Sequence, residues 1–382
     1  MTTDTTAVPG PGDTRFPLWT RAVAAAILLY MFLLSITMMG ASFKLFGKEF
    51  ATGLVEATSN PVAGLFIGIL ATSLVQSSST TSSLIVGVVA TGMIPVETAI
   101  PMIMGANVGT TITNTIVSFG FVTRKEDFRR AFAGATVHDA FNVLTLIVLF
   151  PIEVVFHPIQ RLAEFFTGTL GGVEGAHLPN PLKLILKPVS GFIEHVLTDT
   201  MNFTPRGAAW LILSISLIVM IFSLVYLVRN LKVLVVKRAE EAINRYLFRN
   251  DFTAFLLGLV LTVSVQSSSI TTSLIVPMVG AGVVSLRRCY PFTLGANVGT
   301  TCTALLASMA GDQMAGLTVA LAHLIFNVMG IAIFYPLRSV PIFLAQRLAD
   351  LAVKSKVAAI MFVLGLFFVL PLVFVVIFKF FS

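Results

Sequence analysis

The chain has 382 residues, of which 56% are hydrophobic and only 11% are charged. An ordinary soluble domain carries roughly a quarter of charged residues, so this chain has too little polar surface to cover a water-soluble globule. The composition also excludes a disordered chain, a collagen and a coiled coil. It predicts an all-α polytopic membrane protein.

The net charge of +7 is explained by basic residues that lie in loops beside apolar runs, rather than by nucleic-acid binding. The only two cysteines, Cys289 and Cys302, form no CxxC pair and no zinc-binding spacing. We interpret both as small packing residues, and we expect no metal cofactor and no nucleic-acid partner.

Five long apolar runs are predicted to be transmembrane helices, because about 20 apolar residues span a bilayer. Before them, residues 1–20 are predicted to be a loose polar tail that lacks the basic region and cleavage site of a secretory signal. Three runs are uncharged and bounded by basic residues, whereas two contain ionisable groups. The uncharged runs are Ala22–Phe43, Gly207–Val228 and Val357–Phe378, and the other two are Ala131–Ile152 and Gln313–Leu337.

Two further segments, Pro61–Thr123 and Phe252–Ser308, are apolar overall but are interrupted by Gly, Pro and hydroxyl residues. Membranes tolerate such interruptions only where the backbone is shielded by protein or lines a cavity. We therefore expect re-entrant, broken helical hairpins in these segments rather than smooth spanning helices.

Basic residues concentrate in segments 124–130, 229–249 and 338–356, which the positive-inside rule places in the cytoplasm together with the N-terminus. The stretch 157–206 then forms an external or interfacial connector. The chain accordingly divides into five parts, which are the tail 1–20, a first membrane half 21–156, the connector 157–206, a second membrane half 207–337, and a cytoplasmic loop with a C-terminal helix, 338–382.

The strongest feature of the sequence is an internal duplication. The sequence VQSSSTTSSLIV at Val75–Val86 returns as VQSSSITTSLIV at Val265–Val276, and GANVGTT at Gly105–Thr111 returns unchanged at Gly295–Thr301. Both pairs are separated by 190 residues, from 76 to 266 and from 107 to 297. Paired, interrupted hydrophobic segments of this kind mark the binding site of secondary transporters.

The two copies, 61–153 and 252–335, are predicted to have inverted topology. The first broken segment ends in the basic loop at Arg124, whereas the second ends at residues 310–313, which contain no Lys or Arg. Under the positive-inside rule these two ends lie on opposite sides of the membrane.

Each QSSS sequence places one amide and three hydroxyls within an apolar chain. Burying such groups unpaired costs roughly 2 kcal/mol or more each, so a partner is required. Helix packing through small hydroxyl residues is the alternative for any single serine. For the repeated cluster we favour a ligand site, which comprises Gln76, Ser77, Ser78, Ser79, Gln266, Ser267, Ser268 and Ser269.

The ligand class follows from the few fixed charges in the broken segments, which are Glu97, Arg287 and Arg288. Hydroxyls, backbone N–H groups and the positive end of a helix suit an anion, and hydroxyl and carbonyl oxygens suit an alkali cation. A site that binds an anion and sodium together would neutralise charge without buried Lys or Arg.

The GANVGTT sequences are predicted to serve the same site. Their glycines allow tight turns and close backbone approach, and their polar side chains can then face a ligand. Capping of the next helix is the alternative. The polar residues concerned are Asn107, Thr110, Asn297 and Thr300.

Asp139 lies inside a predicted span, three residues before Asn142, so the two share a helical face. An ionisable residue within a membrane helix indicates a functional site, and the alternative is a buried carboxylate paired with a neighbour such as His138. We interpret His323, which has no acidic neighbour, as a structural residue. No GxSxG or HExxH sequence is present, so we do not expect an enzyme.

Together these motifs closely resemble the type II sodium-dependent phosphate cotransporters. The resemblance rests on the two QSSS sequences, the two GANVGTT sequences and the run FRRAFAGATVHD at Phe128–Asp139, and it covers about Pro61–Glu153 and Phe252–Tyr335. The bacterial branch is the more similar one, because the termini are short and the cysteine-bearing external loop of animal members is missing.

The resemblance implies that the QSSS segments end re-entrant hairpins that meet midway through the membrane and hold inorganic phosphate. By this likeness, Ser77, Ser78, Gln266, Ser267 and Ser268 match the phosphate-associated region, Thr110, Thr300 and Thr303 match positions tied to substrate or sodium, and Asp139 and Asn142 match a sodium site. We therefore predict a phosphate site formed by the two QSSS sequences with Asn107, Thr110 and Asn297, and a set of sodium ligands formed by Asp139, Asn142, Thr300 and Thr303.

The expected function is electrogenic, sodium-coupled import of phosphate by alternating access in the cell (inner) membrane. Sodium is then a co-substrate, and the lipid bilayer is the only other expected partner; the sequence does not give the oligomeric state. Two alternatives stay open at this point. One is a sodium-coupled transporter of another oxyanion or small polar solute, and the other is an ion channel.

Overall fold

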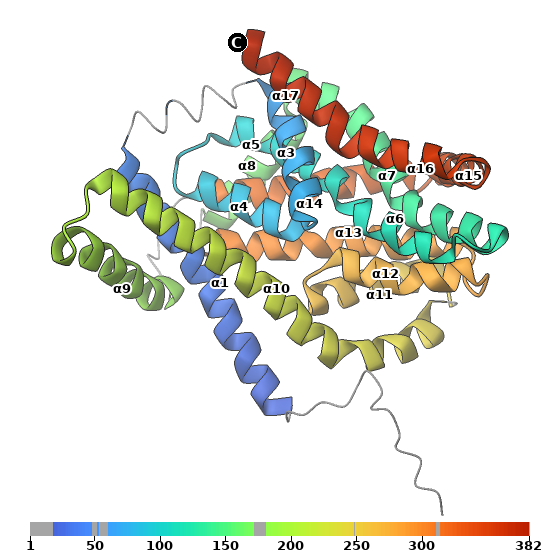
Figure 1. Cartoon of the computed structure of the whole chain (residues 1–382), viewed down its shortest axis with the longest axis horizontal. Coiled ribbons are helices and arrows are strands. Elements are labelled where there is room, and N and C mark those ends of the chain that lie inside the picture. Colours follow the sequence, from blue (N-terminus) through green and yellow to red (C-terminus); the bar gives the residue numbers. More distant parts are fainter. Residues whose placement is uncertain are drawn as a thin grey trace, which may run out of the picture.

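The computed structural model describes residues 18–47, 52, 60–171, 181–247, 249–310 and 314–381, which form helices joined by short connections without any β-strand in these ranges (Figure 1). Five of the described helical segments are long and apolar enough to cross a membrane, and they coincide with the five predicted spans, apart from Gln313, which lies outside the described residues. They are Trp19–Phe46, Lys125–Phe156, Pro205–Lys232, Met314–Phe334 and Lys356–Ile377. Most of the predicted tail, residues 1–17, lies outside the described residues.

Two long helices, α1 (Leu18–Phe46) and α10 (Pro205–Tyr246), pack along one another on one side of the molecule (Figure 1). A buried apolar seam that includes Phe32 and Leu224 joins them to the helices behind. The Asn230 amide also donates a hydrogen bond of 2.7 Å to the backbone carbonyl of Arg21. Of this pair, α10 supplies part of the wall of the site described below.

The segment before α10 forms α8 (Pro158–Gly171), α9 (Pro181–His195) and a π-helical turn (Val196–Thr200). Helix α8 packs against α14 and α9 packs against α1. Both helices keep large apolar side chains exposed, including Phe165 and Phe192. Exposed apolar faces of this kind are typical of helices that lie in a membrane interface.

The two broken segments form two sets of short helices with the same order. The first contains α3 (Pro61–Val75), α4 (Ser78–Ala90) and α5 (Val96–Val108), followed by a 3-10 turn at Gly109–Thr111, α6 (Ile112–Ser118) and a second 3-10 turn at Phe119–Phe121. The second contains α11 (Asp251–Val265), α12 (Ser268–Gly280) and the continuous α13 (Leu286–Ser308). A helix of 15 residues is only about 22 Å long, so none of α3, α4, α11 and α12 spans a bilayer core. The predicted interruptions are therefore present.

Glycines bring the first and third helices of each set into direct backbone contact. A Cβ atom added at Gly105 would lie 2.0 Å from the carbonyl oxygen of Leu65, and one added at Gly295 would lie 1.9 Å from that of Phe255. The expectation of close backbone approach is thus confirmed. The expectation of tight turns is wrong for Gly105, Gly295 and Gly299, which lie inside α5 and α13, whereas Gly109 begins a 3-10 turn. So close a contact between two helices requires glycine, and the helix continues through the glycine.

The remaining helices enclose the hairpins. Helix α7 (Lys125–Phe156) packs against α15 (Ser339–Lys354), and α14 (Met314–Phe334) packs against α13 and α4. The last helical segment runs through α16 (Lys356–Leu364), a π-helical turn (Gly365–Val369) and α17 (Leu370–Phe381), which lies beside α3 at the upper edge of Figure 1.

Candidate functional site

Each QSSS sequence is the break between two helices. Gln76 ends α3 in the left-handed conformation with φ of 59°, and Gln266 ends α11 in the same way with φ of 58°. Ser77 and Ser267 follow with extended backbone and cap the N-termini of α4 and α12. Left-handed backbone is uncommon for residues other than glycine. Its occurrence at both glutamines shows that the duplicated sequence adopts one local geometry twice.

The glutamine side chains are held by matching partners. Each donates a hydrogen bond from Nε2 to a carbonyl three residues earlier, that of Ser73 or Val263. Each also accepts a bond at Oε1 from a threonine that follows the GANVGTT sequence, at 3.3 Å from Thr113 for Gln76 and 2.9 Å from Thr303 for Gln266. The two duplicated sequences of each half are therefore physically connected.

The two breaks lie against one another. The Ser79 hydroxyl approaches the backbone carbonyl of Gln266 at 3.4 Å, and the Ser269 hydroxyl approaches that of Thr110 at 3.5 Å. Residues from both breaks and from α10 line a single, partly open cavity of about 240 Å³. The lining residues are Val75, Gln76, Ser77, Ser79, Thr80, Leu224, Val225, Val228, Arg229, Gln266, Ser267 and Ile270.

The N-terminal ends of α4 and α12 meet at this cavity, because their capping serines line it. Ser77 Oγ accepts bonds from the Thr80 backbone N–H at 3.2 Å and from the Thr80 hydroxyl at 2.9 Å, and neither bond uses the Ser77 proton. Ser267 Oγ likewise accepts a bond from the Ile270 backbone N–H, at 3.4 Å. Two positive helix ends and two hydroxyl donors thus converge on one space, which is a favourable environment for an anion.

Three of the QSSS serines, Ser78, Ser268 and Ser269, are not among the residues that line the cavity. Ser78 and Ser268 are buried as the first residues of α4 and α12, where their backbone carbonyls accept bonds from the Ser82 and Thr272 hydroxyls. Of the eight predicted residues in the QSSS pair, the structure brings Gln76, Ser77, Ser79, Gln266 and Ser267 to the cavity wall.

The GANVGTT asparagines lie in a separate, fully buried polar network where α5, α7, α13 and α14 meet. Asn297 Nδ2 donates to Asn142 Oδ1 at 2.9 Å and to Asn327 Oδ1 at 3.0 Å. Asn107 Oδ1 lies 3.1 Å from His323 Nε2, and the Asn107 carbonyl accepts a bond of 2.9 Å from Asn142. The structural interpretation of His323 agrees with this bond. The network couples residues of both halves rather than lining the cavity.

Asp139 is buried on α7 with 1% of its surface exposed, and neither carboxylate oxygen has a hydrogen-bond partner. Its predicted companion Asn142 belongs to the asparagine network instead. The buried hydroxyls of Thr110 and Thr300 donate to carbonyls one turn earlier in their own helices. An uncompensated buried carboxylate is costly, and either a bound cation or protonation would remove that cost.

The sequence did not point to Thr113, Asn114 or Arg229 as site residues. Thr113 could have been found, since it matches Thr303 at the repeat spacing of 190 residues. Asn114 exchanges bonds with α12, donating to the Thr272 hydroxyl at 2.7 Å and accepting from Ser273 at 3.1 Å. In the sequence, Arg229 is only the basic residue that bounds a predicted span, and its place in the cavity wall depends on packing between different helices.

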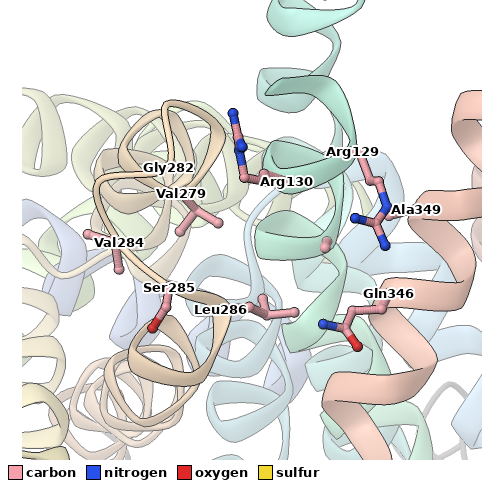
Figure 2. Close-up of a pocket in the computed structure, with 10 residues that line it drawn as sticks. Arg129, Arg130, Val279, Gly282, Val284, Ser285, Leu286, Gln346 and Ala349 are labelled. Carbon is pink, nitrogen blue, oxygen red and sulfur yellow. The ribbon is translucent and has the colours of Figure 1, made fainter. Parts of the chain in front are cut away.

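A second cavity of about 220 Å³ lies between α7, α15 and the turn that joins α12 to α13 (Figure 2). Its two arginines are already paired, because Arg129 Nε donates to Asp350 at 2.6 Å and Arg130 binds both Asp127 and the Gly280 carbonyl. Figure 2 shows Arg130 on the side of α7 that faces the turn at Gly282, away from Arg129. This cavity contains none of the predicted site residues.

Comparison with known proteins finds a family model and relatives whose descriptions agree with one another. The family model described as Na+/Pi-cotransporter matches residues 31–164 and 219–370. The chain is 34% identical to sodium-dependent phosphate transport protein 2A of Rattus norvegicus and 32% identical to sodium-dependent phosphate transport protein 2B of Homo sapiens, in each case over 90% of its own length. It spans 65% and 63% of the length of these relatives.

No solved structure matches the chain significantly. The family model nevertheless covers most of the sequence, including both QSSS interruptions, both GANVGTT sequences and Asp139. This protein belongs to the Na+/Pi-cotransporter family.

Proposed function

We propose that this protein imports inorganic phosphate together with sodium by alternating access. The observation that carries the proposal is the convergence of both QSSS interruptions on one cavity, where two helix N-termini and the Ser77 and Ser267 hydroxyls are available to an anion. The names of the mammalian relatives, which describe sodium-dependent phosphate transport, support the same substrate pair.

The proposed sodium ligand is Asp139, with Asn142, Thr300 and Thr303 as further candidates from the sequence. Asp139 is supported by its burial and by its two unpaired oxygens. Sodium prefers hard oxygen ligands, and a bound ion would neutralise a carboxylate that otherwise lies uncompensated among apolar helices. Import would then be electrogenic if the remaining ions balance the charge of phosphate.

The proposed orientation places the N-terminus and the basic segments 124–130, 229–249 and 338–356 on the cytoplasmic side of the cell membrane. The two halves are proposed to be inverted repeats. The equal geometry of Gln76 and Gln266, and of their bonds to Thr113 and Thr303, supports a repeat of the local fold. The inversion itself rests on the charge distribution of the loops.

Uptake of radiolabelled phosphate into proteoliposomes tests the function. We expect uptake that saturates with phosphate and requires an inward sodium gradient, with little uptake when potassium replaces sodium. Arsenate should compete and sulfate should not, because sulfate lacks the proton that a glutamine Oε1 could accept. Equal competition by sulfate would support the alternative oxyanion transporter, and sodium flux that needs no phosphate would support the channel.

A further inference from the structure

The cavity between the two QSSS interruptions has one charged side chain in its described wall, that of Arg229 on α10. The other polar lining groups are neutral hydroxyls and amides. Phosphate carries between one and two negative charges near neutral pH. Neutral donors and helix ends offer only partial charges to such an anion. A full positive charge in the wall would therefore attract the anion more strongly.

Arg229 is available to a ligand. Its guanidinium lies over the Tyr226 ring, 5.4 Å from the centroid, and the side chain is exposed. No described carboxylate pairs with it. Four other arginines, on α7, on α13 and at the start of α15, are each paired with an aspartate instead, namely Arg129, Arg130, Arg288 and Arg338. A guanidinium has five N–H donors, and stacking on an aromatic ring occupies none of them.

The position of Arg229 along α10 gives the side on which it acts. It lies 24 residues after Pro205, which is about 36 Å along a helix and therefore near the far boundary of a bilayer core of about 30 Å. Val225 and Val228, within one turn of Arg229, line the same cavity. In the proposed orientation the basic segment that starts at Arg229 is cytoplasmic, so the arginine lies at the cytoplasmic mouth of the cavity.

We propose that Arg229 is a phosphate-binding residue, whose guanidinium holds the anion at the cytoplasmic mouth while the α4 and α12 N-termini hold it from within. This inference rests on the proposed function. Because α10 belongs to neither hairpin, the contribution of Arg229 depends on the packing that brings α10 against both QSSS interruptions. Arg229 is therefore expected to contact phosphate in conformations, such as the one described, in which α10 lines the cavity.

The test measures equilibrium binding of radiolabelled inorganic phosphate to the purified full-length protein in sodium buffer. Arg229→Gln should weaken binding about tenfold, as expected for the loss of a charge-assisted hydrogen bond. Arg229→Lys should retain part of the affinity, because it keeps the charge but loses the planar fork. The matched control is Arg347→Gln, which removes another arginine that lies over an aromatic ring, that of Phe343 at 4.9 Å, but does not line this cavity.

Salt provides a second readout that a structural role would not change. Raising choline chloride from 0.05 to 0.5 M should weaken phosphate binding to the wild-type protein more than to Arg229→Gln, because the screened charge is missing from the variant. The melting temperature of each variant confirms folding. If Arg229→Gln does not fold, a folded Arg229→Lys variant with a severalfold weaker affinity decides in favour of the proposal.

Two results would overturn the inference while leaving the proposed function intact. One is an unchanged phosphate affinity in Arg229→Gln or, if that variant does not fold, in Arg229→Lys. The other is an equal loss in Arg347→Gln, which would assign the effect to the general surface potential. A wild-type protein that neither binds nor transports phosphate would instead overturn the proposed function itself, and the inference with it.

Discussion

The Thr303 hydroxyl donates a hydrogen bond of 2.9 Å to Oε1 of Gln266, and Thr113 makes the matching bond to Gln76 at 3.3 Å. Each threonine follows its GANVGTT sequence by two residues. The bond fixes the amide orientation of a glutamine that lines the cavity and whose backbone is left-handed. It also gives a physical reason for the constant spacing between the two duplicated sequences.

Replacing Thr303 by valine should weaken phosphate binding by about three- to tenfold, because a neutral hydrogen bond contributes about 0.5–1.5 kcal/mol and the freed amide would lose its orientation. Thr303→Ser keeps the hydroxyl and should bind like the wild type. Equilibrium phosphate binding by both variants checks the prediction, and equal affinities for valine and serine would contradict it. A change confined to the sodium dependence would instead favour Thr303 as a sodium ligand.

The double substitution Ser77→Ala and Ser267→Ala should nearly abolish phosphate uptake. Each hydrogen bond to a charged group contributes about 1.5–3 kcal/mol, so the loss of two implies at least a 100-fold weakening of affinity. Both serines also cap helices, and alanine at such a position costs about 1 kcal/mol of stability.

A matched glycine pair separates the two effects, because glycine at an N-cap costs only a few tenths of a kcal/mol. Ser77→Gly with Ser267→Gly should therefore keep a near wild-type melting temperature and still lose phosphate uptake. Uptake that recovers in the glycine pair would show that the serines act only as caps.

Asp139→Asn should remove one coupled sodium and make uptake less sensitive to membrane potential. The reason is that the empty transporter would no longer carry the negative charge of Asp139 when it returns across the membrane. Some uptake should persist, because the cavity residues Ser77 and Ser267 are unchanged. Uptake under an imposed potassium–valinomycin potential provides the measurement. Asp350→Asn, which removes a surface carboxylate of α15, is the control. Identical voltage responses in wild type and Asp139→Asn would leave Asp139 a purely structural role.

Gly258→Ala should prevent correct packing of α11 on α13, because the added Cβ would lie 2.0 Å from the Phe292 carbonyl oxygen. Overpacking in a well-packed core costs about 1–3 kcal/mol, and a backbone atom cannot move aside as a side chain can. We expect a low yield of folded protein and a lower melting temperature. Gly191→Ala, where no atom lies within 4 Å of the added Cβ, should be close to neutral.

Asp251 links the starts of α11 and α13 to the end of α14 through Arg288, Arg338 and Tyr335. Burial alone would raise the pKa of this carboxyl, but the bonds from Arg338 and Tyr335 and the nearby arginine charges outweigh it, so the pKa lies below its ordinary value of 3.8. A lowered pKa means that the cluster stabilises the fold above about pH 4 and that this contribution disappears as the pH falls further.

Asp251→Asn should therefore lower the melting temperature at pH 7, and the difference from the wild type should shrink below pH 4. Melting curves of the purified protein at pH 7 and pH 3.5 measure this. Asp199→Asn, at an exposed pair with His195, is the control and should change little at pH 7. A difference that stays constant down to pH 3.5 would show that the Asp251 charge does not matter.

The sequence alone determined the membrane class, the five long apolar helices and the two segments in which helices are interrupted. These features are local, because about twenty apolar residues span a bilayer wherever they occur, and Gly, Pro and hydroxyl residues interrupt the apolar run in which they lie. The exact repeat at 190 residues also allowed both QSSS interruptions to be assigned to one predicted site before any contact was known.

Tertiary structure decided which polar residues share a space. Asn107 and Asn297 are polar residues of a duplicated sequence, as the QSSS serines are. They nevertheless lie in a buried network with Asn142, Asn327 and His323. Arg229, which in the sequence only bounds a predicted span, lies in the cavity wall. Helix periodicity gives the face of a residue on its own helix, but it does not say which distant helix that face will meet. Those pairings depend on packing between different helices, some of them far apart in sequence, as are Ser79 and Gln266, which are 187 residues apart.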